Sequence, residues 1–186
     1  MSLHQVSHLS GPYQYEFRIP RLGHALTETF LKEESHVNGL WNSILHYWFN
    51  QNQYIIAPEY WTEGHTLRGD LAVLKVGVSK SQPVFAFEGK NSEPGPAAWD
   101  QAVKQVGGYL DSHIAKIGGT AYGVVAAGHR FMFLKKSGSV IWRLSDNISN
   151  VLEETGLQQS LNILKHEDQI KTAHLLNQIK AVVEKW

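Results

Sequence analysis

The chain has 186 residues, with 17 basic and 17 acidic side chains and no cysteine. This length is enough for one domain with a proper core. The lack of cysteine excludes disulfides, thiolate metal sites and a cysteine nucleophile. A net charge of zero argues against a protein that coats nucleic acid non-specifically, although a local basic cleft is compatible with it.

The sequence shows neither a signal-peptide pattern nor an apolar run long enough to span a bilayer. We therefore expect an intracellular protein, cytoplasmic or nuclear, without a membrane partner. Residues 1–25 have no clear period and are interpreted as an N-terminal arm. From residue 26 the pattern becomes helical, and a short strand is expected at 54–58. The helix has one wide apolar face, formed by Val37, Leu40, Trp41, Ile44, Leu45, Trp48 and Phe49.

Two apolar strands joined by a polar turn follow, and charged residues lie at their ends. Asp70 opens the first strand, while Glu88 and Lys90 close the second. Because side chains alternate along a strand, Glu88 and Lys90 should point to the same face. Charged residues are depleted in strands. Their convergence here favours a divalent metal held by the two carboxylates, with the lysine beside the reacting group.

The rest of the chain predicts a helix over 96–117 and strands at 122–127, 130–134 and 140–142. The turn between the last two contains Lys135 and Lys136, which are interpreted as a solvated hairpin tip. We predict an α/β (α+β) fold with a central mixed sheet, in which ligands bind at strand ends. The expected organisation is one domain over 1–186, with a core at 26–135 and a helical C-terminal extension at 144–186.

This order and these residues resemble the PD-(D/E)XK nuclease superfamily, which has the restriction-endonuclease-like fold of helix, three strands, helix and strand. Its signature of Asp, then Glu or Asp-x-Lys, matches Asp70 and Glu88-Gly89-Lys90. Gly69 stands where the signature has proline. Gln105 and Tyr109 match the Gln-x-x-x-Tyr helix motif of the RecB-like branch, with Gln101 one turn earlier. The resemblance covers roughly residues 34–133, and each motif is short.

The resemblance implies a metal-dependent nuclease, an endonuclease or exonuclease, with DNA as the expected substrate. Its cofactor would be Mg²⁺ or Mn²⁺, bound by Asp70, Glu88 and the carbonyl of Gly89. Lys90 would position or deprotonate the attacking water, or stabilise the transition state.

Further roles follow from the same resemblance. Gln105 would orient the water or Lys90, while Tyr109 and Gln101 would touch substrate or brace the site. The acidic ligand that the first helix supplies in some members would be Glu34, with Glu33 as a rival. Glu59 is another possible acidic contributor.

Simpler interpretations remain open. Asp70 could cap a turn, and Glu88 and Lys90 could form an ion pair on a solvated strand, which would contribute little. The second functional hypothesis is a catalytically inactive domain of this fold that binds nucleic acid or protein. The sequence does not indicate the oligomeric state.

Overall fold

The computed structural model describes residues 26–49, 52–62, 67–77, 81–92, 95–117, 119–153 and 155–185. The arm expected at 1–25 lies outside the described residues. The helices are α1 Glu34–Trp48, α2 Pro96–Ile117 and α3 His166–Val183, with short 3₁₀ helices η1 Phe30–Lys32 and η2 Leu157–Gln159. The strands are β1 Tyr54–Trp61, β2 Arg68–Val76, β3 Ser81–Lys90, β4 Thr120–Ala127, β5 Arg130–Ser137, β6 Val140–Leu144, β7 Val151–Leu152 and β8 Leu161–Asn162.

In the described part of the chain the strands form one mixed sheet. Seven strands follow the order β1-β2-β3-β4-β5-β6-β7, and β8 pairs with β5. Only the β3–β4 pair is parallel among these ladders. The crossover between these two strands is α2, as parallel strands require. The fold is thus α/β with a mixed central sheet, as the sequence predicts.

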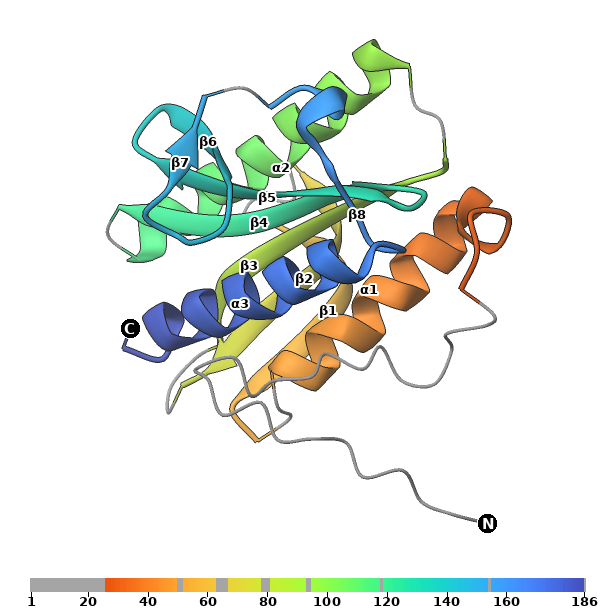
Figure 1. Ribbon diagram of the computed structural model, residues 1–186. Coiled ribbons are helices and arrows are strands. Elements are labelled where there is room, and N and C mark those ends of the chain that lie inside the picture. The colour runs from red at the N-terminus through yellow and green to blue at the C-terminus, as the bar shows by residue number, and fades with distance from the viewer. Residues whose placement is uncertain are drawn as a thin grey trace, which may run out of the picture.

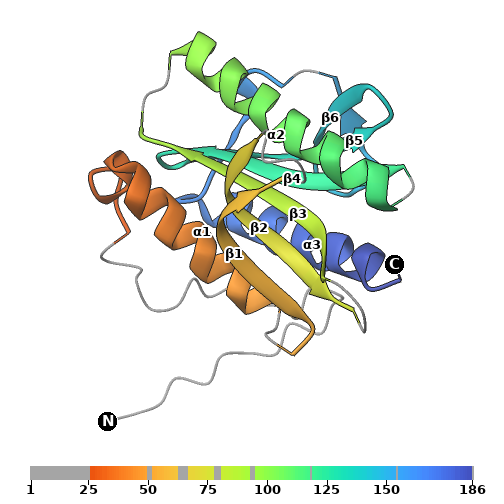
Figure 2. The ribbon, with the colours of Figure 1, turned by 180° about the vertical axis from the view of Figure 1, so that it is seen from behind.

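Helices cover both faces of the sheet. In Figure 1, α1 and α3 lie in front of the strands, and the view from behind in Figure 2 shows α2 across the opposite face. Each face has its own buried apolar cluster. One includes Trp41 of α1, Phe87 of β3 and Leu176 of α3. The other includes Ala86 of β3 and Val106 of α2.

The edge strand β1 carries two features that hinder pairing with another chain. Pro58 has no backbone N–H to offer. Glu59 has a φ of 48°, a left-handed conformation that is uncommon for a residue with a side chain. The regular ladder with β2 is interrupted at Glu59, since Pro58 pairs with Leu71 and Tyr60 with Gly69.

Close packing of α2 on the sheet depends on two glycines. A Cβ at Gly107 would collide with Cδ1 of Ile141 in β6, and one at Gly108 would lie 2.8 Å from Cδ1 of Leu67. Glycine is unfavourable inside a helix. The lack of room for a Cβ at these two positions explains why glycine is nevertheless found there.

Two predictions about the second half are wrong. The extension at 144–186 is not wholly helical, because β7, η2 and β8 precede α3. Lys136 is not part of a solvated tip: it is 6% exposed, and its Nζ lies 2.6 Å from Oδ1 of Asp111 on α2. Lys135 donates to the carbonyl oxygen of Ile148 at 3.2 Å.

Candidate metal and nucleic-acid site

The candidate site lies where β2 begins and β3 ends. Asp70 is the third residue of β2, and Glu88 and Lys90 lie at the end of β3. The antiparallel register pairs Leu71 with Phe87. Asp70 and Glu88 are the next residues along the two strands, so both lie at the same end of the β2–β3 pair.

Direct hydrogen bonds join these strand ends. The backbone N–H of Gly89 donates to Oδ2 of Asp70 at 2.8 Å, and Nζ of Lys90 donates to Oε1 of Glu88 at 2.6 Å. The Glu88 side chain is only 4% exposed. The interpretation of Glu88 and Lys90 as a solvated surface pair is therefore wrong for Glu88, although the ion pair itself is present.

Burial and mutual charge set the protonation of this group. Burial, and then the negative charge of Asp70, raise the pKa of Glu88 above its ordinary value, although contacts with Lys90 and Tyr109 oppose the shift. Burial lowers the pKa of Lys90, but contact with Glu88 and the charges of Asp70 and Glu34 leave it above the ordinary value. Repulsion between two carboxylates is the condition that a bound cation relieves.

Helix α2 brings Tyr109 onto the buried carboxylate. The Tyr109 hydroxyl donates to the carbonyl oxygen of Arg68 at 2.5 Å and lies 3.2 Å from Oε2 of Glu88. Burial, followed by the charge of Glu88, raises the pKa of Tyr109, so this hydroxyl keeps its proton at neutral pH. Tyr109 braces the start of β2 against the end of β3.

The two glutamines of the helix motif differ in their surroundings. Gln105 is half-buried one turn before Tyr109, and its Oε1 is buried without a hydrogen-bond partner in the described part of the chain. Gln101 is exposed. An unpaired buried oxygen is costly, so Oε1 of Gln105 is an acceptor that a neighbouring donor would stabilise.

Helix α1 approaches the same strand end from the opposite face of the sheet. Glu34 is its first residue, is exposed, and acts on the pKa of Lys90. Glu33 is exposed at the N-cap position, with no side-chain capping bond. Glu34, and not Glu33, is among the charges that raise the pKa of Lys90.

The sequence analysis missed Asn38, which lies one helical turn after Glu34. A Cβ at Gly89 would overlap Oδ1 of Asn38, so this amide presses on the residue between Glu88 and Lys90. Its Oδ1 is buried and unpaired among the described residues. A polar residue beside the apolar positions 37, 40 and 41 was the signal that could have drawn attention to it.

Glu59 does not join the carboxylate pair. Its Oε1 lies 3.6 Å from Nη1 of Arg68, and both side chains are largely exposed. The Arg68 guanidinium also lies over the Trp61 ring, 5.9 Å from the centroid. Neither Arg68 nor Trp61 was among the predicted site residues.

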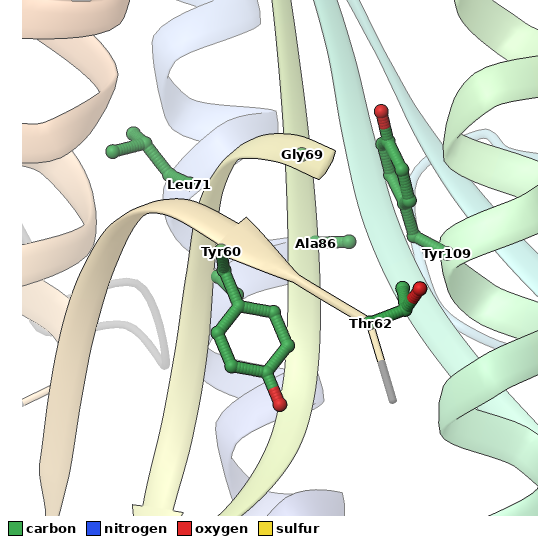
Figure 3. Close-up of a pocket in the computed structure, with 7 residues that line it drawn as sticks. Tyr60, Thr62, Gly69, Leu71, Ala86 and Tyr109 are labelled. Atoms are coloured by element: carbon green, nitrogen blue, oxygen red, sulfur yellow. The ribbon is translucent and has the colours of Figure 1, made fainter. Parts of the chain in front are cut away.

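A small pocket lies beside Tyr109 on the α2 side of the sheet. Figure 3 shows Tyr60 and Thr62 coming from the end of β1, Tyr109 from α2, and Ala86 projecting between them. The pocket has room for about one water molecule. It is too small for a nucleobase.

The residues present fit a hard divalent cation. Within the described ranges, no three His, Asp or Glu side chains are grouped to hold a metal. However, Mg²⁺ is commonly bound by one or two carboxylates, with waters and substrate phosphates as the other ligands. Gly89 occupies Oδ2 of Asp70, which leaves Oδ1 as the oxygen that could bind a cation. Glu88 could bind the cation only after one of its oxygens had released its contact with Lys90 or Tyr109.

Comparisons of the chain with protein-family models, curated proteins and solved structures found no match. No described helix is long and apolar enough to cross a membrane. Any function assigned to the chain must therefore be argued from its own residues and their geometry.

Proposed function

We propose that this protein is a metal-dependent nuclease that hydrolyses phosphodiester bonds of nucleic acid, with DNA as the preferred substrate. The observation that carries the proposal is that Asp70 and Glu88 lie at the same end of the β2–β3 pair, close enough for their charges to interact. Lys90 lies in direct contact with Glu88. Two carboxylates and the positively charged side chain of a lysine at strand ends form a set suited to phosphoryl chemistry.

We also propose the restriction-endonuclease-like fold for the core. Support comes from the element order α1, β1, β2, β3, α2 and β4, in which β1 to β3 are antiparallel and β3 pairs with β4 in parallel. Further support comes from the signature residues, because Asp70 lies near the start of β2, Glu88 and Lys90 lie at the end of β3, and Gln105 and Tyr109 lie on α2.

In this proposal Asp70 and Glu88 hold Mg²⁺ or Mn²⁺, and the carbonyl of Gly89 is a further candidate ligand. When bound, such a cation lowers the pKa of a coordinated water and neutralises charge on the scissile phosphate. Lys90 contributes positive charge beside the reacting phosphate. Gln105 orients the attacking water through Oε1, and Tyr109 keeps Glu88 in place.

The decisive experiment measures cleavage of labelled single-stranded and duplex DNA by the purified chain with Mg²⁺, with Mn²⁺ and with EDTA. We expect cleavage that depends on the metal and is abolished in Lys90→Ala. Asp100→Asn, an exposed change on the same helix, is the control for general damage. Cleavage that persists in EDTA, or in Lys90→Ala at the wild-type rate, would contradict the proposal.

One observation favours a second candidate, an inactive domain of this fold that binds nucleic acid or protein. The 2.6 Å Lys90–Glu88 ion pair occupies a carboxylate oxygen that a metal would use. Isothermal titration with Mn²⁺ separates the candidates. Binding that disappears in Glu88→Gln supports the nuclease, whereas oligonucleotide binding without metal uptake or cleavage supports the inactive domain.

A further inference from the structure

We propose that Trp61 and Arg68 form a stacking surface for an unpaired nucleic-acid strand next to the Asp70–Glu88–Lys90 site. This inference rests on the proposed function and adds the form of the substrate: a single strand, or the frayed end of a duplex.

The first argument is the exposure and chemistry of the pair. Trp61 ends the edge strand β1 and keeps 46% of its surface exposed. It pairs with Arg68 across the β1–β2 ladder, and the guanidinium lies 5.9 Å from the ring centroid. Aromatic rings and guanidinium planes are the two kinds of surface on which proteins stack unpaired bases.

The second argument is position. Arg68 precedes Asp70 by two residues on β2, a span of roughly 7 Å in a strand. In a stacked nucleic-acid strand, successive phosphates advance about 3.4 Å along the axis. A base over Trp61 would therefore belong to a nucleotide within a few positions of the phosphate at Asp70.

The third argument is rigidity. The carbonyl oxygen of Arg68 accepts the hydrogen bond from Tyr109, whose hydroxyl also lies 3.2 Å from Glu88. The backbone of the stacking surface is thus tied to the catalytic carboxylate. In the structure the Arg68 side chain forms an ion pair with Glu59 at 3.6 Å, and the two side chains are 53% and 74% exposed. Such a pair is weak, so a phosphate can replace Glu59.

The fourth argument selects a single strand over a duplex. A base presents its face to Trp61 only where it is unpaired or unstacked. The adjoining pocket is too small to enclose a base, so a base near Trp61 would lie on the ring and not inside that pocket. The net charge of zero also argues against binding through broad contact with a duplex backbone.

The test uses the full chain with Asp70→Asn to stop cleavage, and a fluorescein-labelled DNA oligonucleotide, either single-stranded or as the blunt duplex. We expect Trp61→Ala to weaken single-strand binding about tenfold or more and duplex binding much less, while Trp61→Phe retains most of the affinity. Arg68→Ala should weaken binding and reduce its dependence on salt. Tyr47→Ala, an exposed aromatic on α1 at 62%, is the matched control.

A second measurement does not depend on how the variants fold. A single-stranded oligonucleotide with 2-aminopurine near the scissile position should lose fluorescence on binding to the Asp70→Asn chain, because stacking quenches that base. Absence of quenching, or equal affinity losses for single strand and duplex in Trp61→Ala, would overturn the inference. Metal-dependent cleavage by wild type would then leave the proposed function standing, whereas a chain that neither binds nor cleaves DNA would refute both.

Discussion

Gly89 donates its backbone N–H to Oδ2 of Asp70 across 2.8 Å, so the residue between Glu88 and Lys90 fixes the carboxylate of the neighbouring strand. Asp70→Asn keeps an oxygen that accepts this bond, whereas Asp70→Ala removes it. We expect both changes to abolish cleavage, because each removes a metal ligand. Asp70→Ala should also lose about 1–3 kcal/mol of stability, since it leaves the N–H of Gly89 unpaired.

Relief of repulsion with Glu88 acts in the opposite direction in both variants, so the comparison between them isolates the hydrogen bond. Chemical denaturation in EDTA measures the difference in stability between the two variants. A cleavage assay in Mg²⁺ measures their activity. Equal stability of Asn and Ala variants would show that the Gly89 bond contributes nothing.

The raised pKa of Glu88 makes stability depend on pH. The native state binds the Glu88 proton more tightly than the unfolded chain does. This site therefore stabilises the fold at low pH, and its contribution falls as pH rises from the ordinary glutamate pKa through the raised one. Asp70→Asn removes the second largest cause of the raised Glu88 pKa. The loss of stability with rising pH should therefore become smaller. Urea unfolding of the metal-free protein across this range checks the sign, with exposed Glu59→Gln as control.

Tyr109→Phe should change both stability and titration. It deletes the hydroxyl that contacts the carbonyl oxygen of Arg68 and Glu88, and we expect a loss of about 1 kcal/mol. Because the Tyr109 hydrogen bond lowers the pKa of Glu88, its removal should raise that pKa further. NMR titration of side-chain carboxyls measures the shift. Tyr47→Phe, at an exposed tyrosine, should leave it unchanged.

Gln105 offers a separation of catalysis from stability. Gln105→Met preserves the shape of the side chain and removes the unpaired buried oxygen. The thermal midpoint should therefore stay the same or rise. Single-turnover cleavage should slow by at least about tenfold with little change in DNA affinity, because the amide orients reactants. Asp100→Asn, at an exposed position of the same helix, is the control, and an unchanged rate in Gln105→Met would remove Gln105 from the mechanism.

Gly89→Ala tests the contact between α1 and β3. The added Cβ would overlap Oδ1 of Asn38 and lie 3.1 Å from Cε1 of Phe87. Overpacking of this kind typically costs about 1–3 kcal/mol. Asn38→Ala should restore most of the loss in the double variant, which a double-mutant cycle measures. No coupling between the two changes would mean that Asn38 moves aside freely.

The elements that position the site could be predicted because their signals are local. The pattern over 96–117 matches α2 at both ends, with Pro96 favourable at a first helical position and a left-handed glycine, Gly119, after the helix. The charged ends of β2 and β3 stand out against apolar runs. Their alternation puts Glu88 and Lys90 on one face without knowledge of any long-range contact.

What the sequence could not predict depends on packing between distant segments. Strands β7 and β8 have two residues each, too few for a period, and exist through their pairing with β6 and β5. Lys136 is buried because α2 brings Asp111 to it. The role of Asn38 depends on the docking of α1 against Gly89, and that of Arg68 on the hydroxyl of Tyr109.

The position of α3 has a practical consequence for work with shortened versions of the chain. Nζ of Lys75 donates to the carbonyl oxygens of Val183 and Glu184 at 3.0 Å each, and Leu175, Leu176 and Ile179 are fully buried with the apolar face of α1. Expression fragments cut before His166 to isolate the motif-bearing half would uncover this apolar layer and aggregate. Purification tags are better attached through a linker that starts beyond Lys185.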